Sequence, residues 1–340
     1  MRKPFISVII VNWNGRRLLE ECLTSLSEVS YSNKEILFVD NASLDSSVSY
    51  VRKNFPNVKI IQNAKNLGFA GGNDVGFEKA SGDAILILNT DTIVEKNLLD
   101  ALGDTLYSAN NIGAVQPKIV MYPQTNFIDS IGSFFLINGD LYHYGREKDP
   151  GLSIYNKEMD IFSAKGACIL FRREVLEKTG LFDKDYFAYF EDTDLSMRIW
   201  LSGYRIIYTP KTTVYHKGGA TAKKVVPSYI QFHSYKNRLC TYIKNLSFKY
   251  LCRVMPLTII IYESACILYL AKRKLDISWA IQKAIFWNIM HIKQTLQKRK
   301  HIQRKIRVVK DDSFLRRLTR RVRLSYYYYQ FFGGIERYRD

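Results

Sequence analysis

Short apolar runs alternate with amphipathic stretches through the first 120 residues. Residues 84–88 are five consecutive apolar side chains, a run too short for a helix and typical of a strand buried on both faces. Residues 16–27 instead place leucines and a cysteine on one helical face. Repeated units of this length predict an α/β fold, a mostly parallel sheet with right-handed crossovers and helices on both faces.

The same pattern locates the other elements. Strands are expected at 7–11, 35–39, 58–61 and 114–120, and helices at about 46–55, 71–80 and 98–107. Residues 121–160 show no clear period. Regular elements then resume with a strand at 162–171, helices at 172–179 and 194–202, and short strands at 205–208 and 212–215.

Polar side chains follow three of the predicted strands directly. Asn12, Asp40 and Asp91 each come just after an apolar run, so we expect them at one edge of the sheet. A carboxylate at Asp40 can accept hydrogen bonds from a ribose hydroxyl or a base N–H. Asp91, after Asn89, can hold a hard divalent cation and the phosphates it bridges. The alternative is that the segment from Asn89 to Thr92 turns the chain and caps the next helix.

A glycine-rich segment precedes the third predicted helix. Glycines permit close backbone approach, and a following helix N-terminus favours a phosphate group. The alternative is a flexible loop without a ligand. The candidate phosphate-contact residues are Asn66, Gly68, Gly71, Gly72 and Asn73.

Two adjacent acids, Glu191 and Asp192, directly follow a segment, 186–190, in which four of the five residues are aromatic. An apolar wall raises the proton affinity of a carboxylate, as a general base requires, whereas the alternative is capping of the helix that follows. His216 ends a predicted strand before a glycine pair. It is a candidate metal ligand beside Asp91, and the alternative is a structural histidine.

Charge is distributed unevenly. The 340-residue chain has a net charge of +18, yet residues 1–216 hold 23 basic and 26 acidic side chains, and residues 217–340 hold 27 basic and 6 acidic ones. This asymmetry predicts an anionic partner surface for the last third alone. Five widely spaced cysteines without a Cys-x-x-Cys suit a reducing compartment. The apolar start is expected to be a strand and not a signal peptide.

Five ordered blocks resemble glycosyltransferase family 2, most closely the rhamnosyltransferase-like enzymes of bacterial polysaccharide and lipopolysaccharide assembly. The resemblance covers about residues 5–220. The blocks are SVIIVNWNG, VDNASLDSS, NLGFAGGND, ILILNTDT and FAYFEDTDLSMR.

The resemblance implies a type A glycosyltransferase fold and inverting transfer of a sugar from a nucleotide-diphosphate sugar to a glycan hydroxyl. It makes Asn12 and Asp40 nucleotide contacts and the loop 66–73 a donor contact. Asn89 to Asp91 resembles the Asp-x-Asp motif that binds Mn²⁺ or Mg²⁺, with Asn89 in place of the first acid. Asp192 resembles the general base, with Glu191 beside it to orient the acceptor, and His216 resembles a late metal ligand found in some members.

Two regions are therefore expected, a catalytic domain at 1–220 and a basic, mainly helical region at 221–340. The latter has apolar stretches at 254–271 and 277–292 and a basic tail at 293–323. We expect interfacial helices on the cytoplasmic face of the cell membrane, near a lipid-linked acceptor. The alternatives are one membrane span, or helices that only pack on the catalytic domain.

Other function classes fit less well. The basic third and its aromatic tail are compatible with nucleic-acid binding, but no nucleic-acid-binding motif is present and no nucleic-acid partner is expected. A nucleotidyltransferase typically needs a clustered pair of acids to bind two metal ions, and Asn89 in place of an acid weakens the case for that class of enzyme. A non-catalytic nucleotide-sugar site remains open. So does transfer of another hexose, such as galactose or glucose, because the sequence does not specify the sugar.

Overall fold

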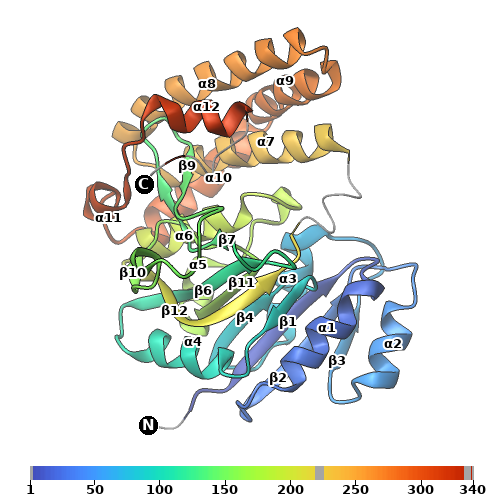
Figure 1. The fold of residues 1–340 in the computed structure, drawn as a ribbon. Helices are drawn as coiled ribbons and strands as arrows, with labels where there is room; N and C mark the ends of the chain where they lie inside the picture. Colours follow the sequence, from blue (N-terminus) through green and yellow to red (C-terminus); the bar gives the residue numbers. More distant parts are fainter. Residues whose placement is uncertain (1–2, 219–225, 333–337, 339–340) are drawn as a thin grey trace.

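The computed structural model describes residues 3–218, 226–332 and 338, and contains a large central sheet under a layer of helices (Figure 1). The strands run in the order β10-β12-β6-β11-β4-β1-β2-β3, with β5 paired to β12 and β7 to β6. Their bounds are β1 Ile6–Asn12, β2 Lys34–Asp40, β3 Lys59–Gln62, β4 Ala84–Leu88, β5 Thr92–Val94, β6 Ile112–Met121, β7 Ile128–Ser130, β10 Met159–Asp160, β11 Cys168–Arg172 and β12 Arg205–His216. A separate hairpin joins β8 Ser133–Phe135 to β9 Leu141–His143.

The first half of the sheet is parallel, as the pattern predicts. Strands β4, β1, β2 and β3 are parallel neighbours. The second half is mixed, because β11 lies antiparallel between β4 and β6 while β12 is parallel to β6. The α/β fold class is confirmed, with the long parallel run in the N-terminal strands and one further parallel pair, β6 and β12.

Alternate residues of the central strands face two hydrophobic cores. Val8, Ile10 and Leu86 pack under α1 (Arg16–Ser27), α2 (Ser47–Asn54) and α4 (Leu98–Tyr107). Ile9 and Ile87 face the other side, which α3 (Gly68–Lys79), α5 (Arg173–Thr179) and α6 (Glu191–Leu201) cover. A strand buried on both faces needs apolar residues at every position, which is why the run 84–88 lacks alternation.

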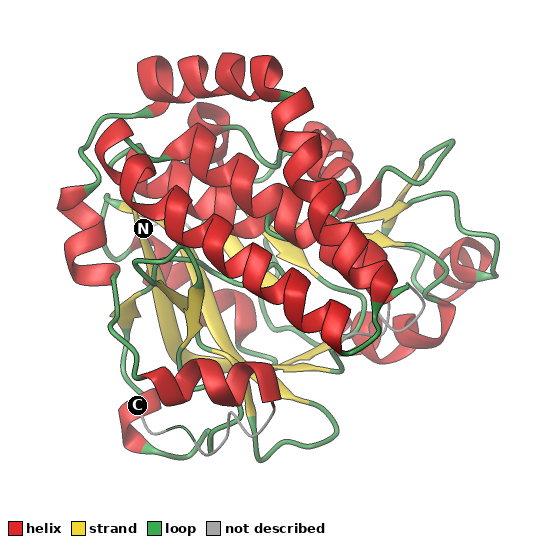
Figure 2. Cartoon of the chain, turned by 90° about the horizontal axis from the view of Figure 1, so that it is seen from above, coloured by secondary structure: helices red, strands yellow, loops and turns green. Residues whose placement is uncertain are grey.

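The C-terminal region is helical, as expected, and lies over the α3, α5 and α6 side of the sheet (Figure 2). Tyr242, Leu246 and Val254 join the same hydrophobic cluster as Phe135 and Leu195, so these helices share a core with the sheet domain. The helices are α7 Pro227–Asn245, α8 Phe248–Ala271, α9 Leu275–Met290, α10 Ile292–His301, α11 Asp312–Leu318 and α12 Leu324–Phe332, with one π-helical turn at Ile302–Ile306.

Two expectations about strands are wrong in detail, and the stretch 121–160 had no predicted elements. The two short strands expected at 205–208 and 212–215 form one strand, β12. Both halves pair with β6, and a register shift between Thr209 and Thr213 separates them. The strand expected at 162–171 begins only at Cys168. The stretch 121–160 contains short strands and 3-10 turns (η1 is Ser153–Tyr155), which are too short to produce a period.

Candidate active site

The ends of β1 and β2 carry two of the predicted nucleotide contacts. Asn12 and Asp40 are partners in the parallel register, and both are buried. Asn12 Nδ2 donates to Asp40 Oδ1 at 3.2 Å and to Ser43 Oγ at 3.1 Å. Asp40 Oδ2 accepts from the Ser43 backbone N–H at 3.0 Å. The Asp40 carboxylate thus organises the loop after β2, and any ligand contact it makes is additional to these bonds.

The glycine-rich segment forms the start of α3, and its glycines are sites of close packing. A Cβ on Gly68 would lie 2.4 Å from the Phe187 carbonyl oxygen, and a Cβ on Gly72 would lie 2.6 Å from Val11. The N–H of Gly68 is bonded to Asn66 Oδ1, and that of Ala70 to the Phe187 carbonyl. These amides at the helix start therefore already have partners within the chain.

The other two residues predicted in this segment are also buried. Gly71 lies against Leu67, to which a Cβ on the glycine would approach within 2.8 Å. Asn73 is fully buried, and its Nδ2 donates to the Phe69 carbonyl at 2.9 Å. Gly71 and Asn73 thus help to form the packed start of α3, whereas Asn66 faces a cavity.

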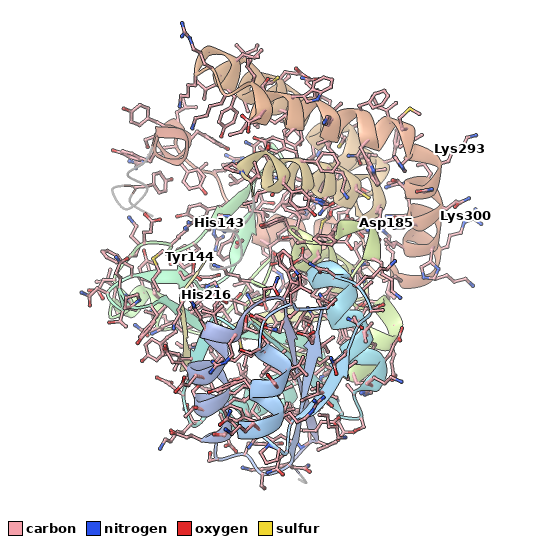
Figure 3. All side chains as sticks on the ribbon, turned by 90° about the vertical axis from the view of Figure 1, so that its right-hand side faces the viewer. His143, Tyr144, Asp185, His216, Lys293 and Lys300 are labelled. Carbon is pink, nitrogen blue, oxygen red and sulfur yellow. The ribbon has the colours of Figure 1, made fainter. Side chains whose placement is uncertain are left out.

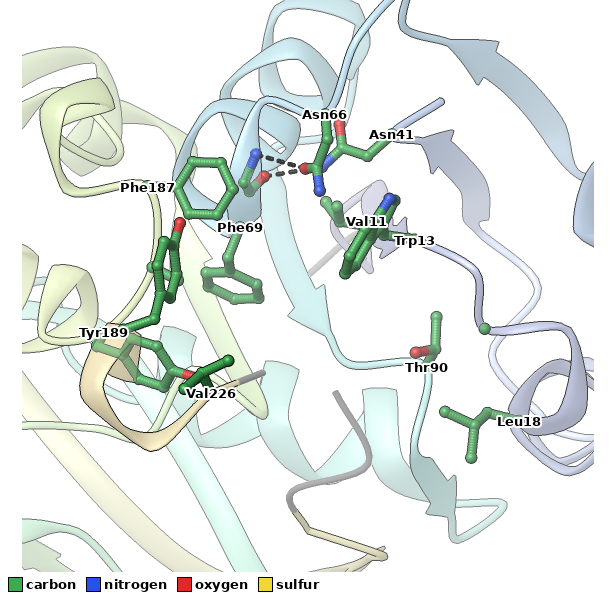
Figure 4. A pocket seen from close by; sticks show the side chains of 14 residues that line it. Val11, Trp13, Leu18, Asn41, Asn66, Phe69, Thr90, Phe187, Tyr189 and Val226 are labelled. Atoms are coloured by element: carbon green, nitrogen blue, oxygen red, sulfur yellow. Dashed lines mark hydrogen bonds between the residues drawn. The ribbon is translucent and has the colours of Figure 1, made fainter. Parts of the chain in front are cut away.

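This cavity of about 410 Å³ opens between the ends of the parallel strands and the loop before α6. In Figure 4, Phe69, Phe187 and Tyr189 lie on one side of it, and Trp13, Asn41 and Asn66 lie on the other. Its lining is mostly apolar and aromatic, with a few amide groups, the composition expected of a small-molecule site that holds a planar ring.

A second cavity of about 350 Å³ adjoins the first and shares Val11, Phe69, Thr90, Ala188 and Tyr189 with it. Five of the predicted site residues line it together, and they come from β4 and the turn after it, from α6 and from the end of β12. They are Asn89, Asp91, Glu191, Asp192 and His216.

Asp91 and His216 belong to a buried chain of charged groups. His216 Nε2 lies 3.2 Å from Asp91 Oδ1, and His216 Nδ1 donates to Asp129 Oδ2 at 2.7 Å. Lys165 Nζ in turn lies 2.7 and 2.6 Å from the two Asp129 oxygens. Strand β12 places His216 beside Asp91 because His216 pairs with Thr92 of β5.

These contacts lower the pKa values of the two carboxyl groups and raise that of the histidine. Burial raises the pKa of Asp91 and of Asp129, but hydrogen bonds to His216 outweigh it, and both pKa values fall below the ordinary range. Burial lowers the pKa of His216, but the bonds to Asp129 and Asp91 reverse this and raise it. Both carboxylates are therefore ionised at neutral pH.

Sequence reasoning missed Asp129 and Lys165. Asp129 lies in the stretch without periodicity, on a three-residue strand, and belongs to no motif. Lys165 precedes Gly166 in the segment 162–171, which was expected to be an apolar strand interrupted at residues 166–168. The pairing of β7 with β6 brings Asp129 to His216 and Lys165, which line the second cavity, and nothing in the residues next to Asp129 indicates that pairing.

The cation-binding potential of the site rests on two side chains. Within the described ranges, no three His, Cys, Asp or Glu side chains are arranged to hold a metal ion. Asp91 and His216 supply one oxygen and one nitrogen toward the cavity. This set fits a Mn²⁺ or Mg²⁺ ion that takes its remaining ligands from substrate phosphates and water.

The acid pair lies in the first turn of α6, which begins at Glu191 and not at Asp194 as expected. Phe190, at the helix N-cap, has a left-handed backbone with φ of 69°. Asp192 Oδ2 accepts from the Gly166 N–H at 2.9 Å, and its Oδ1 accepts from the Thr193 N–H at 2.7 Å. Glu191 is buried, and its Oε2 has no hydrogen-bond partner.

The two neighbouring acids have different pKa values. Burial, and then the charge of Asp192, raise the pKa of Glu191 to about 8. Burial also raises the pKa of Asp192, but the N–H groups of Gly166 and Thr193 oppose that rise. Of the two acids, Glu191 therefore holds its proton more strongly, and Asp192, which accepts hydrogen bonds from two N–H groups, ionises more readily.

The third acid of the segment has a structural role. Asp194 is fully buried and forms ion pairs with Arg198 at 2.9 Å and with Lys244 at 3.1 Å. Asn245 Nδ2 also donates to Asp194 Oδ1 at 2.7 Å. Asp194 thus links α6 to α7 and does not line the cavity.

Comparisons with known proteins agree on one family. The sequence profile described as Glycosyl transferase family 2 matches residues 7–180. N-acetylglucosaminyl-diphospho-decaprenol L-rhamnosyltransferase of Mycobacterium tuberculosis is 25% identical over 252 residues, which cover 67% of this chain and 81% of that protein.

Solved structures share the fold. The mannosyltransferase PcManGT from Pyrobaculum calidifontis, in complex with GDP-Man and Mn²⁺, superposes with a TM-score of 0.54 at 18% identity, over 85% of this chain and 88% of that one. GalNAc-T7 with UDP, GalNAc and Mn²⁺ superposes with a TM-score of 0.57 at 18% identity, over 73% of this chain and 49% of that one.

Proposed function

Because the chain belongs to glycosyl transferase family 2 and is thus a glycosyltransferase that uses a nucleotide-sugar donor, we propose that it transfers the sugar with inversion to a hydroxyl of a lipid-linked or cell-surface polysaccharide. One observation carries the proposal. A cation-binding pair, Asp91 and His216, and an acid pair, Glu191 and Asp192, line the same cavity.

The donor nucleotide occupies the larger cavity in this proposal. Its aromatic lining suits the flat base. Asn12 and Asp40 are not among the residues that line it, but their chain neighbours Val11 and Asn41 are. Asn66 is the member of the glycine-rich segment whose side chain lines the cavity, while Gly68 and Gly72 allow α3 to approach closely enough to form its wall. The diphosphate then extends toward Asn89 and Asp91.

Asp91 and His216 are proposed to hold a divalent cation, Mn²⁺ or Mg²⁺. Mn²⁺ is present in the structures of both similar glycosyltransferases described above. When bound, the cation neutralises negative charge that develops on the departing diphosphate. Asn89 replaces one acid of the usual motif, so the site carries one negative charge fewer.

Asp192 is the proposed general base. It takes the proton of the acceptor hydroxyl while the hydroxyl oxygen bonds to the anomeric carbon, and the bond from that carbon to the diphosphate oxygen breaks with its electron pair on the leaving group. The hydrogen bonds from Gly166 and Thr193 fix the Asp192 carboxylate. Glu191, neutral at its raised pKa, is able to donate a hydrogen bond and orient the acceptor.

A rhamnosyl group is the first choice of sugar. The support is the 25% identity to the mycobacterial L-rhamnosyltransferase, whose name also specifies a lipid-linked acceptor. Galactose and glucose are the alternatives, and a panel of donors distinguishes them.

A membrane-surface location is also proposed, on the cytoplasmic side. One described helix, α8, is long and apolar enough to cross a bilayer, and only 28% of its most apolar window is buried within the protein. Tyr262, Ala265 and Cys266 of α8 nevertheless pack inward, and Glu263 accepts a hydrogen bond from Gln282 of α9 at 2.8 Å. These contacts favour a helix that lies on the membrane and does not span it.

The first experiment is a thermal-shift titration with dTDP, UDP and GDP, each with and without Mn²⁺. A ligand that binds only the folded state stabilises it, by about 2.7 kcal/mol at 100 times its Kd, and therefore raises the midpoint temperature of unfolding. We expect one nucleotide to raise it in a Mn²⁺-dependent manner. No shift with any nucleotide in folded protein would contradict the donor site.

The general base is tested by Asp192→Asn, with Asp104→Asn, an exposed acid on α4, as the matched control. We expect Asp192→Asn to lower kcat by about 100-fold or more and to leave nucleotide binding within threefold, because the base acts only in the transition state. Unchanged turnover would exclude Asp192 as the base.

A further inference from the structure

The loop that leads to the acid pair has an unfavourable backbone conformation. Phe187, Tyr189 and Phe190 have φ of 61°, 71° and 69°. Non-glycine residues in such conformations cost about 1–2 kcal/mol each and persist only where the surrounding structure holds them. The loop enters α6 directly at Glu191, so its conformation determines where the acid pair lies.

The groups that hold this loop come from α7, in the C-terminal region. Asn237 is fully buried, and the two hydrogens of its Nδ2 are shared among three loop carbonyls, those of Tyr186, Ala188 and Tyr189, at 3.1, 2.9 and 2.6 Å. The neighbouring Lys236 donates to the Asp185 carbonyl at 2.7 Å.

The orientation of the Asn237 amide is unambiguous. Its Oδ1 is buried without a hydrogen-bond partner. The reversed amide would place this oxygen against three carbonyl oxygens, which cannot donate. Burial of an amide oxygen without a hydrogen-bond partner costs free energy. The bonds that Nδ2 makes to the loop carbonyls offset this cost.

The held loop contacts both halves of the candidate active site. Ala188 and Tyr189 line both cavities. The Phe187 carbonyl accepts from the Ala70 N–H at the start of α3, on the donor side. Release of the loop would therefore move the acid pair, and it would leave Asn12, Asp40 and Asp91, which lie on the sheet edge, in place.

We propose that Asn237 is a positioning residue that fixes the 186–190 loop and thereby places Glu191 and Asp192 for reaction. The proposal rests on the catalytic role proposed for Asp192. It makes the C-terminal helical region part of the active-site structure, in addition to any contact that region makes with a membrane. A purely structural role, as an amide that joins helices to the domain, is the alternative.

The chain offers a matched control for that alternative. Asn288 of α9 is also a buried asparagine with an unpartnered Oδ1, and its Nδ2 donates to the Lys236 and Ala284 carbonyls at 3.0 and 2.9 Å. It joins α9 to α7 and makes no bond to the loop. Asn288→Ala therefore measures the loss of an inter-helix amide bond alone.

The test compares Asn237→Ala and Asn288→Ala in the full chain, below the midpoint temperature of both. For Asn237→Ala we expect kcat to fall at least tenfold, the Kd of the nucleoside diphosphate to stay within threefold, and hydrogen exchange to speed up in residues 186–192. For Asn288→Ala we expect wild-type kcat and wild-type exchange in that loop. If Asn237→Ala does not fold, Asn237→Ser, which leaves a polar group in place, is measured instead.

Equal kcat in the two variants, or unchanged exchange in the loop, would overturn the proposal. Its failure is separable from that of the proposed function. If Asp192→Asn retains full turnover while Asn237→Ala loses it, the loop matters but Asp192 is not the base. If the wild type shows no transferase activity, the exchange and nucleotide-binding measurements still test whether Asn237 holds the loop.

Discussion

Glu191 is a buried carboxyl group with an oxygen that lacks a hydrogen-bond partner, in contact with a second acid. Its neighbour Asp192 accepts two backbone hydrogen bonds, and Asp194 forms two ion pairs. Three acids within four residues thus have three environments. The partner groups, more than the residue type, determine which acid is neutral, which is available as a base and which is structural.

The raised pKa of Glu191 predicts a pH-dependent loss of stability. Its pKa rises from 4.5 to about 8 on folding, so the folded state binds the proton between these values and the unfolded state does not. The free energy of unfolding must therefore decrease as pH rises from about 4.5 to 8. Glu191→Gln, which mimics the neutral form, is expected to remove on the order of 2–4 kcal/mol of this decrease.

Urea denaturation of the wild type and Glu191→Gln at pH 5, 6.5 and 8 measures the effect. The difference between the two proteins should shift in favour of the variant as pH rises. A constant difference across this range would show that Glu191 titrates near its ordinary pKa in the folded protein. Titrating groups that do not contact Glu191, such as His216, contribute equally to both proteins and cancel, whereas Asp192 is coupled to Glu191 and its change is part of the difference.

Asp129 is predicted to control cation affinity through His216. It accepts the His216 Nδ1–H, which leaves Nε2 directed at Asp91. Loss of such an outer partner typically lowers metal affinity 10- to 100-fold. We expect that loss for Asp129→Ala, measured as Mn²⁺ binding by electron paramagnetic resonance with nucleoside diphosphate present.

Asp104→Ala, on the exposed face of α4, is the control for the removal of one negative charge. An affinity equal to that of the control would mean that His216 is held without Asp129 or does not bind the cation. No sequence signal marks Asp129, since it becomes adjacent to His216 only when β7 pairs with β6.

At the scale of elements, local pattern was sufficient where local contacts dominate. The predicted bounds of β4, α1 and α4 match the structure, because each is a single apolar run or face packed against the central sheet. The pattern failed where tertiary pairing decides, as for β11, whose antiparallel position between β4 and β6 no local run indicates. The same holds for the candidate site. The residues that follow strands were predicted from the sequence, whereas Lys165, which only tertiary contacts bring to the site, was not.

Helix α3 provides a prediction about packing. A Cβ on Gly72 would lie 2.6 Å from Val11 Cγ1, whereas a Cβ on Gly103, inside α4, meets nothing within 4 Å. Gly72→Ala is therefore expected to cost about 1–3 kcal/mol through overpacking. Gly103→Ala is expected to gain about 0.5–1 kcal/mol from helix propensity.

Urea denaturation of both variants checks the pair of expectations. Equal effects, or stabilisation by Gly72→Ala, would mean that α3 can move away from β1 without loss. A shift of α3 would also move the wall of the larger cavity, so the nucleotide Kd of Gly72→Ala reports whether this packing matters for the site.

At the scale of the whole molecule, an acidic sheet domain is joined to a basic helical region through a shared hydrophobic core. The sequence indicated the basic region but not that core, because the contacts between α7 and the 186–190 loop join segments about 50 residues apart. Lys236 and Lys244 of α7 are buried, whereas many of the other basic side chains of this region lie at the surface. Figure 3 shows Lys293 and Lys300 projecting outward from α10.

The outer faces of α8 and α9 are the proposed membrane contact. Trp279 and Phe286, seven residues apart on α9, are 61% and 62% exposed, and Ile260 of α8 is 61% exposed. The turn between the two helices adds Lys272, Arg273 and Lys274, all exposed. Apolar side chains flanked by basic ones fit the interface of an anionic bilayer better than they fit water or a nucleic acid.

Binding of the full chain to vesicles tests this surface. We expect the wild type to bind vesicles that contain phosphatidylserine and to bind them less as salt increases, because Lys and Arg near the surface are screened. The double variant Trp279→Asp with Phe286→Asp should bind at least tenfold more weakly, since each exposed apolar side chain contributes about 1–2 kcal/mol on burial. Ile154→Asp, at an exposed apolar site in the sheet domain, should bind like the wild type. Equal vesicle binding by the double variant and the wild type would exclude this face as a membrane contact. So would a wild type that does not bind vesicles but binds RNA, with the double variant binding RNA equally well. The basic residues would then contact another anionic partner.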